Sequence, residues 1–169
     1  LVAMTTALQP QTVPLHKLLS TCIDAAARGC DRIRRVQESG GVDATLKIAG
    51  DAKSALTAAD LAAQAAVVGA LSKAWPGLTI VGEEDEAALD EDHELATPLD
   101  DALLDWECTT SVDLSKARVF VDPLDGTREF VEGRLDAVQC LVGVAVGDAP
   151  VCGAVGLPFP ADGGRPRVS

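Results

Sequence analysis

The sequence is poor in aromatic residues and in the groups that bind soft metals. It has no Tyr, three Phe, two Trp and two His among 169 residues. Its five cysteines form no CxxC pair, and two histidines are too few for the usual zinc patterns. The scattered cysteines predict reduced thiols in an intracellular compartment, which we take as the cytoplasm with an organelle left open.

Long apolar runs and positive charge are also scarce. No apolar run approaches the 18 residues of a membrane span, and residues 1–13 lack the basic start of a signal peptide. Fourteen Lys and Arg against 26 Asp and Glu give a net charge of −12. This balance argues against nucleic acid polymers and anionic membranes as partners. It suits a protein that gathers cations, although a solvated acidic surface gives the same count.

Hydrophobic residues make up 47% of the chain and are dominated by alanine, which predicts one domain with closely packed helices. Thr57 and Asp60 resemble a capping box at the start of the second helix, with Asp in place of the usual Glu. The buried face of that helix is predicted to hold Leu61, Val67, Val68, Leu71 and Trp75. The predicted elements are helices at 14–38 and 57–75, a strand at 42–48, short buried strands at 78–81 and 118–121, and a hairpin of 137–146 with 151–157.

Two further segments show no such periodicity. Residues 86–105 are rich in acids and are predicted to be a surface insertion with one helical piece. The chain from 158 onward has Gly, Pro and Arg without periodicity, so we expect it to be irregular. The predicted domain therefore covers 14–160, and 161–169 form a tail.

Acidic residues follow two short apolar strands. LTIVG ends in Glu83, Glu84 and Asp85, and RVFV runs directly into the motif DPLDGT at 122–127. Ligands commonly bind at strand ends in open α/β sheets. Several carboxylates in one place repel one another unless a divalent cation neutralises them. Oxygen ligands without His or Cys favour Mg²⁺ over zinc.

The residues of DPLDGT suit a metal and phosphate site. Asp122 and Asp125 are three residues apart, so a tight turn can aim both inward. Leu124 can bury its side chain while offering its backbone carbonyl. Gly126 permits close approach to a phosphate, and its N–H and that of Thr127 can bind phosphate oxygens.

These motifs resemble a known family. GEED at 82–85 and VDPLDGTREFVEG at 121–133 are similar to the Mg²⁺-dependent, Li⁺-sensitive phosphomonoesterases of the inositol monophosphatase superfamily. The continuation Arg128-Glu129-Phe130 is most similar to the 3′(2′),5′-bisphosphate nucleotidase branch. The resemblance implies an α/β fold, a layered α+β sandwich whose sheet is flanked by helices.

The resemblance also implies an activity and a set of site residues. The substrate would be the small phosphomonoester 3′-phosphoadenosine 5′-phosphate, which yields AMP and phosphate with Mg²⁺ as the cofactor. Thr127 would orient the attacking water, and Glu84 would be a further acid behind the metal ligands. The implied metal ligands are Glu83, Asp122, the Leu124 carbonyl and Asp125, and the implied phosphate contacts are Gly126 and Thr127.

The chain departs from the family pattern ahead of the second helix. The family has an Asp three residues before a Thr and six before a second Asp; here Thr57 and Asp60 match, but the first position is Ser54. The resemblance assigns that first Asp to activating the water together with Thr127. Serine is a weak base, so we expect weak activity unless Asp51 takes its place.

A second departure concerns length. Family members continue into another half, with a Trp-Asp motif that supplies a further metal ligand, and this chain has no such motif. We therefore expect a fragment.

Two hypotheses for the function stand: a bisphosphate nucleotidase, or a non-catalytic pseudophosphatase that binds Mg²⁺ or a partner. An inositol polyphosphate or monophosphate phosphatase is the alternative enzyme. A haloacid-dehalogenase-type phosphatase is disfavoured because DxDGT has one residue between its acids. The sequence leaves the oligomeric state open.

Overall fold

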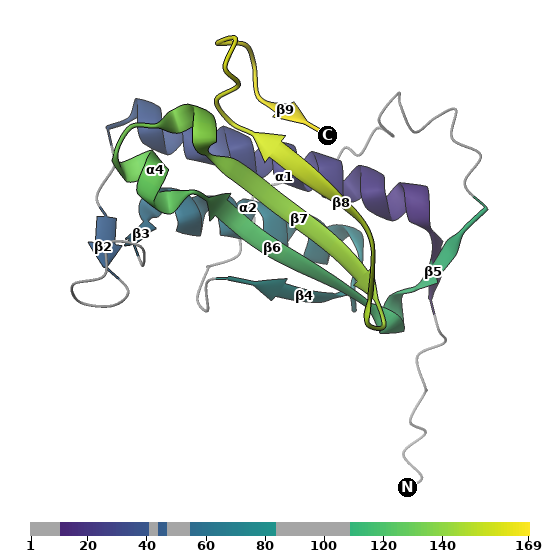
Figure 1. Ribbon diagram of the computed structural model, residues 1–169. Coiled ribbons are helices and arrows are strands. Elements are labelled where there is room, and N and C mark those ends of the chain that lie inside the picture. Colours follow the sequence, from purple (N-terminus) through teal and green to yellow (C-terminus); the bar gives the residue numbers. More distant parts are fainter. Residues whose placement is uncertain (1–10, 41–43, 47–54, 84–108) are drawn as a thin grey trace, which may run out of the picture.

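Two helices pack side by side against one face of a five-stranded sheet (Figure 1). The structure is a computed structural model, and it describes residues 11–40, 44–46, 55–83 and 109–169. The helices are α1 (Leu15–Glu38) and α2 (Ala58–Ala74). The sheet has the order β4-β6-β7-β8-β9, with bounds Thr79–Gly82, Ala117–Asp125, Gln139–Val146, Ala149–Leu157 and Arg167–Val168.

Short elements connect these layers. Strand β1 (Thr12–Pro14) pairs with β5 (Ser111–Asp113), and β2 (Ala44–Leu46) pairs with β3 (Ala55–Thr57). Helix α4 (Thr127–Val131) follows β6 directly. Two single-turn 3₁₀ helices lie at Leu114–Lys116 and Leu135–Ala137.

The sheet is mixed, because β4 runs parallel to β6 whereas β6, β7, β8 and β9 are antiparallel to one another. Strands β7 and β8 form the predicted hairpin. The predicted α/β layered class is confirmed, and so are both long helices. Helix α1 begins at Leu15, one residue later than predicted, with Pro14 as its N-cap, and α2 begins with the predicted capping box.

The core lies between the helices and the inner face of the sheet. Along β6, Ala117, Val119 and Val121 are buried, and they alternate with residues that face away from the helices. On α2 the buried positions are largely alanines, which allow α1 and α2 to approach closely. The prediction for Leu61 was wrong: it is 38% exposed, because Ala59, Ala63, Ala66, Val67, Ala70 and Leu71 form the face that packs inward.

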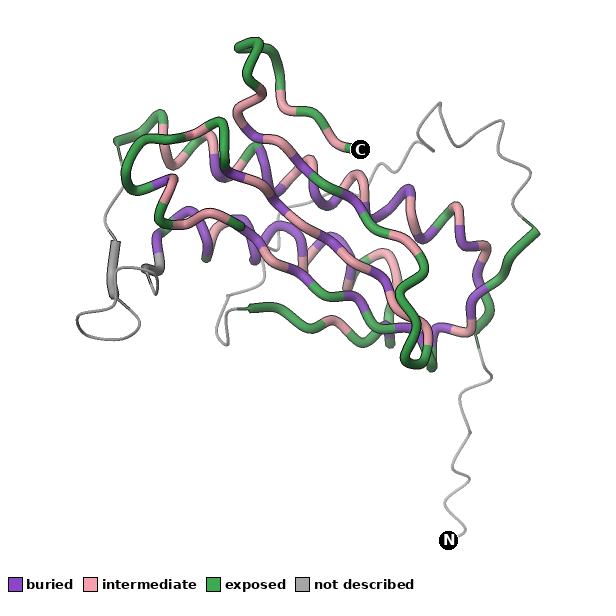
Figure 2. Tube along the Cα trace, viewed as in Figure 1, coloured by how far each residue is buried: buried purple, intermediate pink, exposed green. Residues whose placement is uncertain are grey.

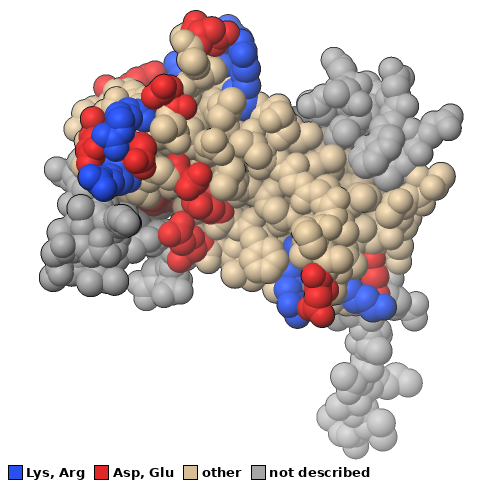
Figure 3. Space-filling model, viewed as in Figure 1, with Lys and Arg blue, Asp and Glu red and all other residues tan. Residues whose placement is uncertain are grey.

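No described helix covers the opposite face of the sheet (Figure 2). Four large apolar side chains on strands β4, β6 and β8 are exposed there: Val81 by 42%, Phe120 by 47%, Val151 by 41% and Val155 by 36%. A broad uncharged expanse results (Figure 3). The expectation that 78–81 is a buried strand is therefore wrong: Leu78 is buried, but no residue of β4 is, because β4 is an edge strand with only one side facing a helix.

The end of the chain also differs from expectation. Residues 158–169 were expected to be irregular, yet Arg167–Val168 pair with Gly156 and Leu157 of β8. The acidic insertion at 86–105 lies outside the described residues. In the described part of the chain, no helix is long and apolar enough to cross a membrane.

The sheet alternation predicts unequal effects of truncating neighbouring residues on β6. We expect Val119→Ala to lower the free energy of unfolding by about 2 kcal/mol, because it opens a cavity under the helices. The matched change Phe120→Ala should cost less than about 1 kcal/mol, because its ring is already half exposed. Urea denaturation of both variants measures this. A larger loss for Phe120→Ala would mean that the outer face is covered.

Candidate functional site

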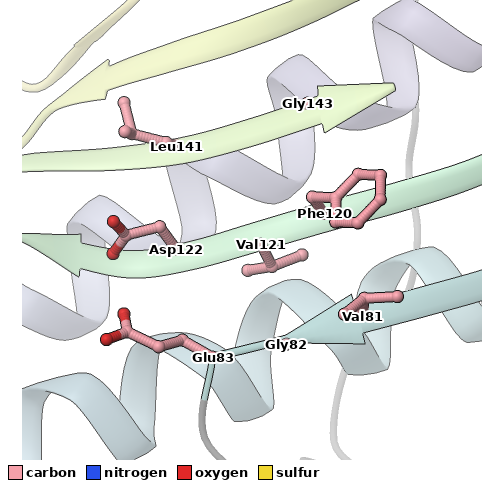
Figure 4. A pocket seen from close by; sticks show the side chains of 8 residues that line it. All are labelled: Val81, Gly82, Glu83, Phe120, Val121, Asp122, Leu141 and Gly143. Atoms are coloured by element: carbon pink, nitrogen blue, oxygen red, sulfur yellow. The ribbon is translucent and has the colours of Figure 1, made fainter. Parts of the chain in front are cut away.

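The parallel register of β4 and β6 brings two acidic residues together. Gly82 lies opposite Val121, and the Glu83 N–H donates to the Val121 carbonyl at 3.1 Å. The next residues along the two strands, Glu83 and Asp122, therefore lie side by side. Their carboxylates extend in the same direction from neighbouring strands (Figure 4).

A β-bulge brings Asp125 to the same side of the sheet. On β6 the pairing passes from Asp122 to Asp125, three residues, while on β7 it passes from Leu141 to Gln139, two residues. In a regular strand, an odd separation places side chains on opposite faces. The extra residue of the bulge restores the parity, so both aspartates can face the same pocket.

Asp122 has a buried carboxylate oxygen that the described protein leaves without a hydrogen-bond donor. Its Oδ1 is buried and accepts no hydrogen bond. Burial, followed by the negative charges of Glu83 and Asp125 and a hydrogen bond shared with Glu83, raises the pKa of Asp122 to about 7. A buried oxygen without a donor is costly, and a cation would relieve that cost.

The start of α4 completes the polar rim. Leu124 is 1% exposed, so its side chain anchors the turn in the core while its carbonyl accepts a hydrogen bond from Thr127 Oγ1 at 3.1 Å. Gly126 has a φ of +88°, which other residues rarely adopt. A Cβ at this position would also lie 3.1 Å from the Ala137 carbonyl.

The capping box of α2 reaches into the site. One oxygen of Asp60, Oδ2, accepts the Thr57 N–H at 2.8 Å and the Thr57 hydroxyl at 2.5 Å. The other, Oδ1, lies 3.1 Å from Thr127 Oγ1, so it and the Leu124 carbonyl are alternative acceptors for the single hydroxyl proton. Asp60 is 1% exposed, and burial raises its pKa while the hydrogen bonds from Thr57 and Thr127 lower it.

The sequence matched Asp60 to the helix cap and to the second Asp of the family pattern, but it did not predict the contact of Asp60 with Thr127. The sequence feature that pointed to this residue was the capping box. There the shorter Asp60 replaces the usual Glu, and only one of its carboxylate oxygens is used by the cap, so the other can reach Thr127. Ser54 and Asp51, proposed as partners of Thr127, lie outside the described residues, as does Glu84. Thr127 has a carboxylate partner in Asp60, so the serine at 54 does not leave it without one.

The end of β4 is held from beneath by α2. A Cβ on Gly82 would lie 2.5 Å from Oε1 of the buried Gln64, so a larger residue here would have to displace that side chain. Glycine allows β4 to pass close over Gln64 one residue before Glu83.

These residues line an open pocket of about 390 Å³. Its walls are formed by Glu83, Asp122, Leu124, Asp125, Gly126, Thr127, Arg128 and Glu129. Glu83 and Asp122 also border a second hollow over the apolar face, beside Val81, Phe120 and Leu141 (Figure 4). Acidic side chains gather at this edge of the uncharged expanse (Figure 3).

The donor set fits Mg²⁺ better than a softer metal. All the candidate ligands are oxygens, and the unpartnered Asp122 Oδ1 gives a direct position for a cation. Within the described ranges, no three His, Cys, Asp or Glu side chains form a metal cage by themselves. Mg²⁺ usually uses one or two carboxylates and completes its shell with water and substrate phosphate.

Comparisons with known proteins agree with this geometry. The model of the inositol monophosphatase family matches residues 14–163. The chain belongs to the inositol monophosphatase family.

The curated relatives that the chain matches include a bisphosphate nucleotidase and an adenosine bisphosphate phosphatase. The chain is 32% identical over 156 residues to 3′(2′),5′-bisphosphate nucleotidase 1 of Dictyostelium discoideum, covering 88% of this chain and 49% of the relative. It is 32% identical over 155 residues to the Golgi-resident adenosine 3′,5′-bisphosphate 3′-phosphatase of Callithrix jacchus, covering 88% and 42%. The chain spans about half the length of the curated relatives it matches.

Solved structures share the fold. SuhB from Bartonella henselae superposes with a TM-score of 0.59 at 24% identity, covering 83% of this chain and 45% of that one. CysQ from Bacteroides thetaiotaomicron, a bacterial member of the inositol monophosphatase family, gives 0.55 at 26% identity, covering 85% and 43%.

The raised pKa of Asp122 predicts a pH dependence of stability in metal-free protein. Between the ordinary Asp pKa near 3.8 and about 7, the folded protein holds a proton that the unfolded chain has lost. The free energy of unfolding should therefore fall as pH rises through this window, and Asp122→Asn should lack this component. Urea unfolding in EDTA at pH 5 and pH 7.5 measures it. Equal pH dependence in both proteins would contradict the assignment.

Proposed function

We propose that this chain carries the Mg²⁺ and phosphate site of a phosphomonoesterase that acts on 3′,5′-bisphosphate nucleotides. The substrate would be 3′-phosphoadenosine 5′-phosphate, which is adenosine 3′,5′-bisphosphate, and the products AMP and phosphate. The observation that carries the proposal is the buried, unpartnered Oδ1 of Asp122, beside Glu83, in a pocket whose next wall is the DGT turn. Family membership and the names of the relatives support the reaction class.

The chain's own residues would divide the work between metal and phosphate. Glu83, Asp122, Asp125 and the Leu124 carbonyl would hold Mg²⁺. When bound, the metal supplies charge neutralisation at the phosphoryl oxygens and lowers the pKa of a bound water. The N–H groups at the start of α4 have no acceptor within the helix, so those of Gly126 and Thr127 can donate to phosphate.

Thr127 and Asp60 would position the attacking water. The Thr127 hydroxyl donates its one proton toward Asp60 Oδ1 or the Leu124 carbonyl, each 3.1 Å away. Its oxygen lone pairs remain able to accept a hydrogen bond from a water in the pocket. Asp60 fixes the hydroxyl through one carboxylate oxygen while the other stays within the helix cap. A proton from the water would then pass toward the Asp60 carboxylate through Thr127.

Two other functions share the same metal site. A non-catalytic protein would bind Mg²⁺ without turnover, and an inositol phosphate phosphatase would prefer a different leaving group. The nucleotidase is favoured because the curated relatives named above are nucleotide phosphatases. We also propose an intracellular location, since Cys22, Cys30 and Cys140 are buried thiols that form no disulfide within the described residues.

Removing the central carboxylate should abolish metal binding. We expect Asp122→Asn or Asp125→Asn to weaken Mg²⁺ binding at least tenfold in calorimetric titration at pH 7.5, because each removes a charged oxygen ligand. Asp148→Asn, in the exposed β7–β8 turn, is the matched control and should bind like the unmodified chain. Unchanged binding in both site variants would remove the proposed site.

The proposed water-positioning role predicts a hydroxyl requirement at position 127. Thr127→Val should lower phosphate release from adenosine 3′,5′-bisphosphate about 100-fold or more, while Thr127→Ser should retain most activity. Asp60→Asn should resemble Thr127→Val in rate while leaving Mg²⁺ affinity unchanged. Malachite-green assays with this substrate and with inositol 1-phosphate measure it. Mg²⁺ binding without release from either substrate would favour the non-catalytic protein.

A further inference from the structure

Arg128 lines the same pocket as the acidic residues. It follows Thr127 directly in α4, and it is the one cation among the described residues that form the pocket wall. Its side chain is 49% exposed, so a ligand in the pocket can reach it. The walls nearer β4 and β6 carry Glu83, Asp122 and Asp125, so the pocket has an acidic side and one basic position.

A second arginine offsets the acids that surround Arg128. Arg134 donates to Glu129 Oε1 at 3.1 Å and also pairs with Glu132. Arg128 Nε donates to Glu132 at 2.8 Å. Two arginines and two glutamates thus balance in charge, and Glu132 is shared between both arginines. Glu129, which also lines the pocket, has its own partner in Arg134.

This arrangement leaves donors on Arg128 for a ligand. Within the described part of the chain, its hydrogen bonding involves Nε only, so the two terminal nitrogens remain for an added acceptor. A guanidinium offers paired donors that match two phosphate oxygens. Glu132 holds the stem of the guanidinium and limits its motion, which reduces the entropy lost when a phosphate binds.

We propose that Arg128 forms a second anion subsite that takes the phosphate not being hydrolysed. The inference rests on the proposed function and gives its substrate class a physical basis. A nucleoside 3′,5′-bisphosphate carries both phosphates on one ribose. With one phosphate at Thr127 and the metal ligands, the other falls within reach of the adjacent residue's side chain. A monophosphate would leave the Arg128 subsite without its ligand.

Binding of two ligands that differ by one phosphate tests the subsite. Adenosine 3′,5′-bisphosphate and adenosine 3′-monophosphate are titrated calorimetrically into the full chain, with Ca²⁺ replacing Mg²⁺ to slow turnover. Arg128→Gln should weaken bisphosphate binding about tenfold and leave monophosphate binding within about twofold. Arg118→Gln, an exposed arginine on β6 outside this pocket, is the matched control and should change neither.

Two further variants separate ligand contact from a structural role. Arg128→Lys keeps the charge and should lose only part of the bisphosphate affinity. Glu132→Gln weakens the contact that orients the guanidinium and should lower bisphosphate affinity by less than Arg128→Gln does. Equal loss of both ligands in Arg128→Gln, or no loss of either, would overturn the subsite while leaving the proposed function intact. Failure of the unmodified chain to bind either ligand would overturn both.

Discussion

The parallel pairing of β4 with β6 sets Glu83 against Asp122, and the rest of the site depends on this contact. The half-buried carboxylate of Asp122 beside the exposed carboxylate of Glu83 is unfavourable without a compensating charge. The burial of Asp122 Oδ1 adds to that cost, and the raised pKa of the Asp122 carboxyl is its result. The fold keeps the two residues together because β4 packs closely over Gln64 at Gly82 and the Glu83 N–H donates to the Val121 carbonyl of β6.

Scaffold and site share residues instead of lying in separate layers. Leu124 buries its side chain in the core while its carbonyl faces Thr127, so the packing of β6 determines the position of the turn. Asp60 caps α2 with one oxygen and holds Thr127 with the other. The start of the second helix and the start of α4 are therefore fixed to each other across 67 positions of sequence.

Motif and periodicity were sufficient to predict the helices, the hairpin and the acids at two strand ends, since those features are local. They could not predict the bulge between Asp122 and Asp125, because its parity depends on the pairing with β7. They also misplaced Leu61 and Val81, since a helix rich in alanine has no clear apolar stripe and a strand next to one helical layer has only one buried side. The role of Asp60 required the distance to Thr127, which no spacing encodes.

A crystal structure of the chain grown with Mn²⁺ in place of Mg²⁺ would show directly whether Asp122 binds a cation. Manganese prefers the same oxygen ligands and is located by its anomalous scattering. We expect an anomalous peak in direct contact with Asp122 Oδ1, within the pocket bordered by Glu83 and Leu124. A peak elsewhere, or an empty pocket with Asp122 paired to a protein donor, would contradict it.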